Sequence, residues 1–337
     1  MARTSPLSFQ DADVAGSEGL TDYRRLYKKE MLLAKGSFAS VYQITAKGEG
    51  SRKFAAKISK ISMNTVTAVS ELQDVEIKVL RLMKESEYVL TLVDVCVDQE
   101  RPNLGKIIVT ELCSGTLEDK MKGMDLRSFV SNAEQAKRYT HQLVCGLADL
   151  HHHKIAHRDI KPANILVMMG QDEQWRLKYC DFGHSTITDD QILSDVRGTI
   201  PYCAPEEFFC KGFTFKADVW SLAMCVVRFW KPGGANLISS PAAPTGTIHH
   251  YRGHIKKIIS VFGGITDTTF CDTTKKRMAY FYAFADLCNA PAGSKLHANI
   301  KNTRIPQTAL DLMDGMFRYD PEARLSAAEA THHPYFQ

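Results

Sequence analysis

Apolar and polar positions divide the chain into a strand-rich part followed by a helix-rich part. Between residues 23 and 112, short apolar runs separated by turn residues predict strands, most clearly in LLAKGSFASVYQI, KFAAKIS and KIIVTEL. One segment of this part, VSELQDVEIKVLRLM, instead has the apolar spacing of one helix face, at Val75, Val79, Leu80 and Met83. The first part is therefore predicted to be a sheet with one helix.

Beyond residue 114 the apolar spacing is that of helices. AKRYTHQLVCGLADLHH has a single apolar stripe, and DVWSLAMCVVRFW is apolar nearly all round, which predicts a helix buried on every side. RIPQTALDLMDGMFRYD and SAAEATHH predict further amphipathic helices. Strands followed by helices indicate an α+β fold with two lobes, an N-lobe at about 22–113 and a C-lobe at about 114–337.

Two stretches interrupt this pattern. Residues 1–21 are rich in Ser, Ala, Asp and Gly and have no hydrophobic period, so we predict a disordered leader. The region from about 231 to 304 has the character of a long insert and begins with a Pro/Gly/Ser-rich loop, KPGGANLISSPAAPTG. Within it, HIKKIISVF and KKRMAYFYAFADLC have helical spacing.

Composition narrows the function classes. The 337 residues are 44% hydrophobic with a formal net charge of +4, so the chain can bury a core and we expect neither nucleic acid nor a membrane as partner. Nine cysteines without a CxxC pair favour reduced thiols over a disulfide framework or a zinc ribbon. We find no secretory signal and no apolar run near the ~18 residues of a membrane span, and we expect an intracellular protein, cytoplasmic or nuclear or both.

The segment HRDIKPANIL, residues 157–166, has the residues that phosphoryl transfer needs. Transfer to a hydroxyl requires a carboxylate that orients the acceptor and takes its proton, and oxygen ligands for Mg²⁺ on the nucleotide phosphates. Asp159 and Asn164 lie five residues apart in a short loop, with Lys161 between them to meet the transferred group. The alternative is a polar loop that resembles a catalytic motif by chance. Six matching positions make such a chance match improbable.

A second acidic motif, CDFG, places Asp181 after a segment whose pattern is that of a hairpin, LVMMGQDEQWRLKY. Such a hairpin would return the chain to the cleft of Asp159. A hard dication needs an anionic oxygen ligand, which Asp181 supplies. The tripeptide alone is a weak signal, but at this distance from Asp159 it is a strong one, and it predicts ATP and Mg²⁺ as cofactors.

Together these motifs resemble the protein kinase family, over about residues 23–337. The resemblance implies a bilobal protein kinase fold with a small strand-rich N-lobe and a larger helical C-lobe. It implies transfer of the ATP γ-phosphoryl group to protein hydroxyls, and Lys161 and Thr199 are typical of the serine/threonine class. The C-terminal part is similar to the cyclin-dependent and MAP kinase group, although Cys203 stands where that group usually has arginine, which argues against proline-directed specificity.

The resemblance assigns the nucleotide site. Lys57, in AAK, would pair with the α/β-phosphates and be aligned by Glu76. Glu71 is the alternative partner, but its neighbour at i+4, Val75, is smaller than Leu80, which follows Glu76. The implied nucleotide-binding residues are Ala34, Gly36, Ser37, Phe38, Val41, Ala55, Lys57, Thr110, Glu111, Cys113 and Leu166.

Within this set, Thr110 would control the back of the adenine pocket, and the backbone of Glu111 and Cys113 would meet the adenine edge. Of the three glycines usual in the phosphate-binding loop only Gly36 is present, which predicts weaker or slower nucleotide handling. Glu118 is assigned either to the ribose or a basic substrate residue, or, as the favoured interpretation, to a solvated surface position.

Structural and regulatory roles also follow from the resemblance. Glu206, in Ala-Pro-Glu, would pair with a buried Arg324, and Asp218 would brace the catalytic loop; losing one partner of such a buried pair should cost roughly 3–5 kcal/mol. The regulatory residues would be Arg158, Ser194, Asp195 and Thr199. Phosphorylation of Ser194 would act through Arg158, with a permanent charge on Asp195 or an unmodified loop serine as alternatives.

Other function classes fit less well. A pseudokinase that acts as a scaffold would usually lack Lys57, Asp159 or Asp181, and small-molecule kinases of related fold generally lack the Ala-Pro-Glu segment. We expect protein substrates as partners and leave open a regulatory subunit or an upstream kinase; the helix around Glu76 has no cyclin-binding signature. The runs His151–His153 and His249–His250 lack spaced co-ligands, so no zinc site is expected.

Overall fold

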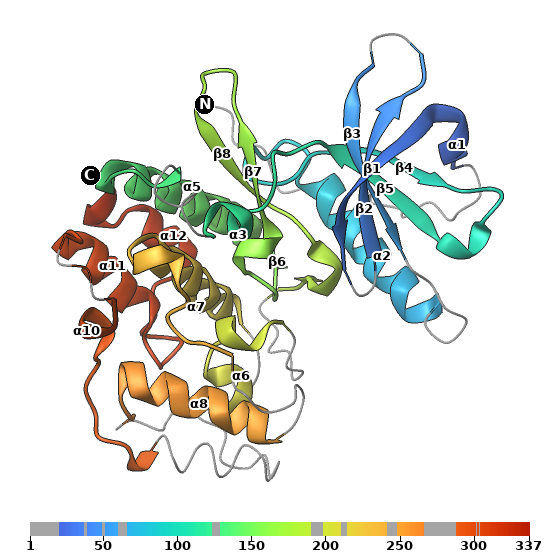
Figure 1. Ribbon diagram of the computed structural model, residues 1–337. Coiled ribbons are helices and arrows are strands. Elements are labelled where there is room, and N and C mark those ends of the chain that lie inside the picture. Colours follow the sequence, from blue (N-terminus) through green and yellow to red (C-terminus); the bar gives the residue numbers. More distant parts are fainter. Residues whose placement is uncertain are drawn as a thin grey trace. The chain divides into compact units, whose positions relative to one another are not determined.

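A five-stranded antiparallel sheet forms the centre of the first part of the chain (Figure 1). Its strands are β1 (Tyr27–Lys35), β2 (Ala39–Ala46), β3 (Lys53–Ser59), β4 (Leu92–Val97) and β5 (Lys106–Glu111), in the order β1-β2-β3-β5-β4. The register sets Val41 opposite Lys57, and Ala55 opposite Thr110. A short helix, α1 (Tyr23–Leu26), precedes the sheet, and Tyr23 and Tyr27 join its buried core with Ile44, Ala56 and Val109.

One helix, α2 (Val66–Leu82), packs on this sheet through contacts with β4 and β5. Val79, Leu80 and Met83 are buried, as the apolar spacing predicts, and Ile77 is buried with them. Val75 is only half-buried. The amphipathic face therefore fixes which carboxylates of α2 point toward the sheet, and this face carries Glu76, which is 5% exposed.

The hairpin predicted after residue 165 is present as β7 (Ile165–Met169) and β8 (Trp175–Tyr179). By their contacts, the residues group into two units, Met1–Ser114 with Leu166–Ser185, and Gly115–Ile165 with Thr186–Gln337. The hairpin belongs to the first unit because Tyr179 bridges Val89 and the Ser114 N–H donates to the Val167 carbonyl at 2.8 Å. This grouping differs from the single boundary near residue 113 that the sequence suggests.

The second unit is mainly helical (Figure 1). Its longer helices are α5 (Ala133–His152), α7 (Phe215–Val226), α8 (Ile248–Phe262) and α11 (Gln307–Met316), and its shorter ones are α3 (Leu117–Lys120), α6 (Glu206–Phe209), α10 (Leu296–Ile300) and α12 (Ala327–Thr331). A two-stranded sheet pairs β6 (Ile155–Ala156) with β9 (Thr186–Ile187). From Ala217 to Val226, α7 is buried throughout, which confirms the prediction from its composition.

The structure, a computed structural model, describes residues 20–36, 39–48, 51–59, 66–122, 129–189, 198–209, 214–240, 248–265, 288–300, 302 and 304–337. Most of the predicted leader and most of KKRMAYFYAFADLC lie outside these ranges, whereas HIKKIISVF falls within α8 as predicted. Thr21, the last residue of the predicted leader, is already part of the structure, because its carbonyl accepts a hydrogen bond from Val97. Across these ranges, no helix combines the length and apolar character that crossing a membrane requires.

Candidate active site

Three ionised side chains meet in the first unit. Lys57, on β3, donates to both carboxylate oxygens of Glu76, at 2.9 and 2.6 Å, and to Asp181 Oδ1 at 2.7 Å. Glu71, the alternative partner considered for Lys57, is exposed on another face of α2. The apolar face of α2 thus selects the carboxylate that reaches Lys57, because Glu76 lies one turn before the buried Leu80.

Neighbouring charges shift the pKa values of Lys57 and Glu76 in this cluster. Burial alone would lower the pKa of the Lys57 ammonium, but the carboxylates of Glu76 and Asp181 outweigh this effect and raise the pKa above its usual range. Burial raises the pKa of Glu76, Lys57 opposes that shift and Asp181 adds to it. At neutral pH Lys57 therefore stays cationic.

Asp181 lies at a sharp turn of the backbone, two residues after the end of β8. Its φ of 64° lies in the left-handed region, which costs a non-glycine residue roughly 1–3 kcal/mol unless the surroundings hold it. The 3-10 helix Phe182–His184 follows, with Phe182 fully buried, and the Asp181 side chain remains 44% exposed. Strain of this kind, next to an exposed carboxylate, is typical of a functional position.

The predicted adenine-side residues gather on β3, β5 and the segment after it. Thr110 is 7% exposed and its hydroxyl donates to the Glu111 carbonyl at 3.3 Å. The Glu111 carboxylate is held by Lys178 at 2.7 Å and by the Thr91 N–H at 2.8 Å. The Lys178–Glu111 pair was not predicted from sequence.

The remaining predicted nucleotide residues lie on β1, β2, β3 and β7 or beside them. Ala34 is exposed on β1, and the strand residues Val41, Ala55 and Leu166 are half-buried. The Gly36 N–H closes the β1–β2 turn on the Ala39 carbonyl at 2.9 Å, whereas Ser37 and Phe38 lie outside the described residues.

Two cysteines of the first unit have raised thiol pKa values and are therefore poor nucleophiles. Burial, with the Glu111 carboxylate adding to it, raises the pKa of Cys113 to about 12. Burial also raises the pKa of Cys180, directly before Asp181, well above its usual value. Because the thiolate is the reactive form, neither residue is suited to nucleophilic chemistry at neutral pH.

A second cluster lies in the second unit around Asp159, which is 6% exposed. Lys161 donates to Asp159 Oδ2 at 2.7 Å, and the Thr199 hydroxyl donates to Oδ1 at 2.9 Å. Asn164 Nδ2 donates to the Asp159 carbonyl at 2.9 Å and to Oδ2 at 3.0 Å. Lys161 also donates to the Thr199 hydroxyl at 2.8 Å, so these four predicted residues form one hydrogen-bonded group.

Asp218, on the buried helix α7, holds the backbone of this loop. Its two carboxylate oxygens accept the N–H groups of His157 and Arg158, at 2.8 and 2.9 Å, and His151 lies 3.2 Å away. Arg158 has a φ of 67°, so the residue before Asp159 is held in a strained conformation. The position of the Asp159 carboxylate is thus set by a side chain far along the sequence.

The predicted Glu206–Arg324 ion pair is buried and bidentate. Arg324 Nη1 and Nη2 donate to the two Glu206 oxygens at 2.5 and 2.8 Å, and the side chains are 0% and 1% exposed. Arg324 also donates to the Lys216 and Arg318 carbonyls and lies over the Trp220 ring. These contacts give the buried guanidinium hydrogen-bond acceptors and a counter-charge in place of the solvent that burial removes.

The predicted regulatory residues are only partly described. Ser194 and Asp195 lie outside the described residues, so regulation through either residue stays a prediction. The Arg158 guanidinium, 5% exposed as part of its residue, donates to the Thr186 hydroxyl on β9 at 3.1 Å. Thr199 belongs to the Asp159 group.

Glu118 corrects an interpretation made from sequence, that of a solvated surface glutamate. Its carboxylate accepts a 2.6 Å hydrogen bond from Arg228, whose side chain is 5% exposed. Arg228 also donates to the Tyr202 hydroxyl at 3.2 Å and to the Gly234 carbonyl at 2.7 Å. The available signal was the single basic residue in the mostly apolar run DVWSLAMCVVRFW, because a cation there must find a buried partner.

Oxygen atoms of the kind that Mg²⁺ binds are present in each unit taken by itself. In the first unit they belong to the Asp181 carboxylate, and in the second to Asn164, whose Oδ1 is available because its Nδ2 is bound to Asp159. In the described ranges no three His, Cys, Asp or Glu side chains gather as a metal site. Mg²⁺ in nucleotide sites needs only one or two protein carboxylates, since phosphate oxygens and water complete its coordination.

Comparison with known proteins places nearly the whole chain in one family. The family described as "Protein kinase domain" matches residues 27–336. The MAPK/MAK/MRK overlapping kinase of Mus musculus is 30% identical over 92% of this chain and 67% of its own length. Cyclin-dependent kinase 7 of Dictyostelium discoideum and the mitogen-activated protein kinase KSS1 of Saccharomyces cerevisiae are each 27% identical over 92% of this chain, and over 79% and 82% of their own lengths.

The match spans both clusters and nearly all of the chain, and the similar proteins are serine/threonine kinases of one group. The chain therefore belongs to the protein kinase family and is a serine/threonine protein kinase, similar to the MAP and cyclin-dependent kinases.

Proposed function

We propose that Asp159 is the catalytic base of this kinase, and that ATP and Mg²⁺ are its cofactors and protein serine and threonine hydroxyls its acceptors. The observation that carries the proposal is the Asp159 carboxylate, which is 6% exposed and held by Lys161, Thr199 and Asn164. A carboxylate held in this way can orient an acceptor hydroxyl and accept its proton. Lys161, beside it, is suited to stabilise the charge of the transferred group.

In this proposal the residues of the first unit bind and orient the nucleotide. Lys57, kept cationic and aligned by Glu76, contacts the phosphates, and Asp181 with Asn164 holds Mg²⁺. The bound Mg²⁺ supplies positive charge that offsets the charge of the phosphates.

Phosphate transfer by the purified full-length chain tests this assignment, with ATP-Mg²⁺ and myelin basic protein as acceptor. Asp159→Asn should lower turnover by roughly 10²–10⁴-fold, the contribution of a positioned general base, with ATP affinity retained. Asp149→Asn, on α5 beside His153, is the matched control and should keep wild-type turnover. Turnover of the Asp159→Asn protein within a few-fold of wild type would refute the role of Asp159, and ATP binding without phosphate transfer by the wild type would indicate a scaffold.

A further inference from the structure

Among the described residues, one edge of the sheet in the first unit is paired at only one end. β4 is the last strand in the order β1-β2-β3-β5-β4, so β5 pairs with one of its edges. On the other edge Asp22 forms a parallel bridge with Val97, and the Val97 N–H donates to the Thr21 carbonyl at 3.1 Å. An edge strand with open N–H and C=O groups is a template for a further strand.

The chain is firmly attached where it reaches this edge. Tyr23 is 5% exposed, the Gln99 N–H donates to the Asp22 carboxylate at 3.2 Å, and Arg24 Nε donates to Asp98 at 3.0 Å. Because the bridge at Asp22 is parallel, the residues before it are aimed back along β4, from Val97 toward Leu92.

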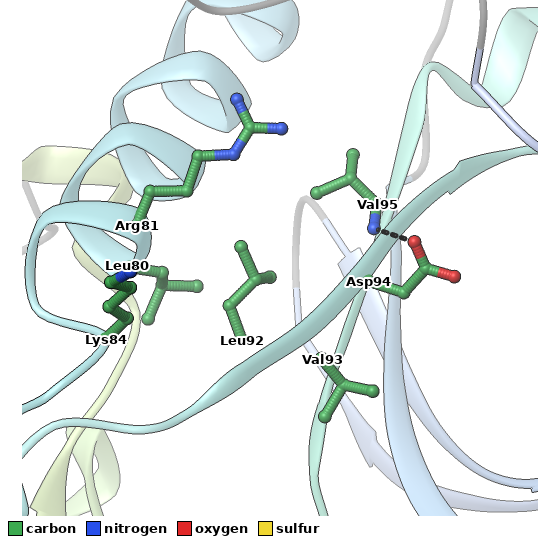
Figure 2. Close-up of a pocket in the computed structure, with 7 residues that line it drawn as sticks. All are labelled: Leu80, Arg81, Lys84, Leu92, Val93, Asp94 and Val95. Carbon is green, nitrogen blue, oxygen red and sulfur yellow. Dashed lines mark hydrogen bonds between the residues drawn. The ribbon is translucent and has the colours of Figure 1, made fainter. Parts of the chain in front are cut away.

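A pocket of about 320 Å³ lies along this stretch of β4 (Figure 2). Leu92–Val95 form one wall, and Leu80, Arg81 and Lys84 of the last turns of α2 and the residues after it form the other. Figure 2 shows Leu80 and Arg81 on the side of the pocket opposite β4. Val93 is 42% exposed, so an occupant of the pocket could cover an apolar side chain that solvent now reaches.

The pocket has a cationic side and an apolar floor. The Lys84 side chain is 71% exposed, and its ion pair is a 3.8 Å contact with Glu85, whose side chain is 89% exposed. The one acid in the lining, Asp94, is occupied by the Tyr27 hydroxyl at 3.2 Å and the Val95 N–H at 2.8 Å. An occupant should therefore be apolar with acidic neighbours.

The chain carries a segment of this chemistry directly before the point of attachment. Residues 1–19 contain the run LSFQDADV, with apolar Leu7, Phe9 and Val14 around acidic Asp11 and Asp13. Continued from Asp22 opposite Val97, a parallel register would set residue 17 opposite Leu92. The ten residues from 17 to 7 can span up to ~33 Å, more than a pocket of this size requires.

We propose that residues 1–19 dock on the β4 edge and on the pocket between β4 and the end of α2 of the same molecule. The backbone nearest Leu20 extends the parallel pairing along β4. The apolar residues of LSFQDADV cover Leu92 and Val93, and its aspartates face Arg81 and Lys84. This mode of binding combines main-chain pairing at an edge with side-chain pockets that select the segment.

Chymotryptic cleavage after Phe9 in the folded full-length protein measures the docking. Val93→Asp places a charge in the pocket wall and should speed this cleavage by about tenfold, which corresponds to ~1.4 kcal/mol of lost docking. Met169→Asp, at an equally exposed apolar residue on β7 (44%), is the matched control and should leave the rate unchanged. Equal cleavage rates in wild type and Val93→Asp would overturn the proposal.

Two further measurements keep the test independent of any effect of Val93→Asp on folding. Phe9→Asp changes only the segment itself and should speed hydrogen exchange of peptides covering residues 92–97; unchanged exchange counts against the proposal. Lys84→Glu should speed cleavage, and Asp11→Lys with Asp13→Lys should restore the slow rate. Protection of Phe9 that increases with protein concentration would mean that a second copy supplies the segment, which would also overturn docking within one molecule.

Discussion

Gly198 shows, at the scale of a single residue, how closely the Asp159 loop is packed. Its φ is 100°, and a Cβ placed there would lie 2.6 Å from the Arg158 carbonyl oxygen. Both the conformation and the space therefore require glycine. The next residue, Thr199, donates the hydrogen bond to Asp159, so Gly198 lets two backbone segments approach and brings that hydroxyl to the carboxylate.

Gly198→Ala is expected to lower kcat by roughly 10- to 100-fold, because even a displacement of about 1 Å in a catalytic group has an effect of this size. ATP affinity should change little, since Lys57 and Glu76 belong to the other unit. The matched control is Gly233→Ala: Gly233 also has a positive φ, 64°, but a Cβ there would meet nothing within 4 Å. Steady-state kinetics of both proteins decide the matter, and equal kcat values for the two would contradict the role given to Gly198.

At the scale of elements, α7 organises the second unit from its interior. Asp218, in its first turn, binds the backbone before Asp159. Two residues after its end, Arg228 binds Glu118 of α3, the Tyr202 hydroxyl and the Gly234 carbonyl. A buried helix with an acid near one end and a base near the other thus fixes several loops at once.

Glu118→Gln should lower the free energy of unfolding by about 2 kcal/mol, because Arg228 would remain buried without its counter-charge. The value lies below the usual ~3–5 kcal/mol for a buried pair because Glu118 is 30% exposed. Replacing both residues, Glu118→Leu with Arg228→Met, should recover part of the loss, because it removes the buried charge but also the donor to the Gly234 carbonyl. The control Lys122→Gln breaks only the exposed 3.9 Å pair with Asp119 and should have almost no effect in denaturant titrations. A double variant no more stable than Glu118→Gln would argue against this account.

For the whole molecule, we expect His254 of α8 to contribute to the loss of stability in acid. The residue is 0% exposed, its Nε2 contacts the Cys203 carbonyl at 3.3 Å, and its Nδ1 has no hydrogen-bond partner among the described residues. Burial lowers its pKa from 6.5 to about 4, because protonated Nδ1 would be a buried charge without solvent.

Stability should therefore fall as the pH decreases from about 6.5 toward 4. In that window the unfolded chain binds a proton that the folded chain does not, so His254 contributes about 2 kcal/mol of destabilisation at pH 5 relative to pH 7. His254→Gln, which keeps a donor for the Cys203 carbonyl, should show a correspondingly shallower decline. Urea titrations at pH 7 and 5 give the comparison, and identical declines in the two proteins would exclude His254 as the cause.

Local patterns in the sequence predict many of the helices and strands and many residues of the candidate site. The short apolar run of KFAAKIS, the helix face around Leu80 and the mostly apolar run of α7 predict elements that the structure contains. Asp159, Lys161 and Asn164 lie within six residues, so a short loop suffices to gather them. Such features need only the chain's own geometry, which is why they can be read from it.

The sequence by itself determined the order of the elements, the family and the residue types that the chemistry needs. Only the tertiary structure decided that Glu118 pairs with Arg228 and Glu111 with Lys178, partners 110 and 67 residues apart. It also decided that the β7–β8 hairpin belongs with the first unit. The physical reason is that a buried charge is stable only with a partner of opposite charge. Whether a residue is buried depends on which distant segments cover it, and a local sequence pattern does not contain that information.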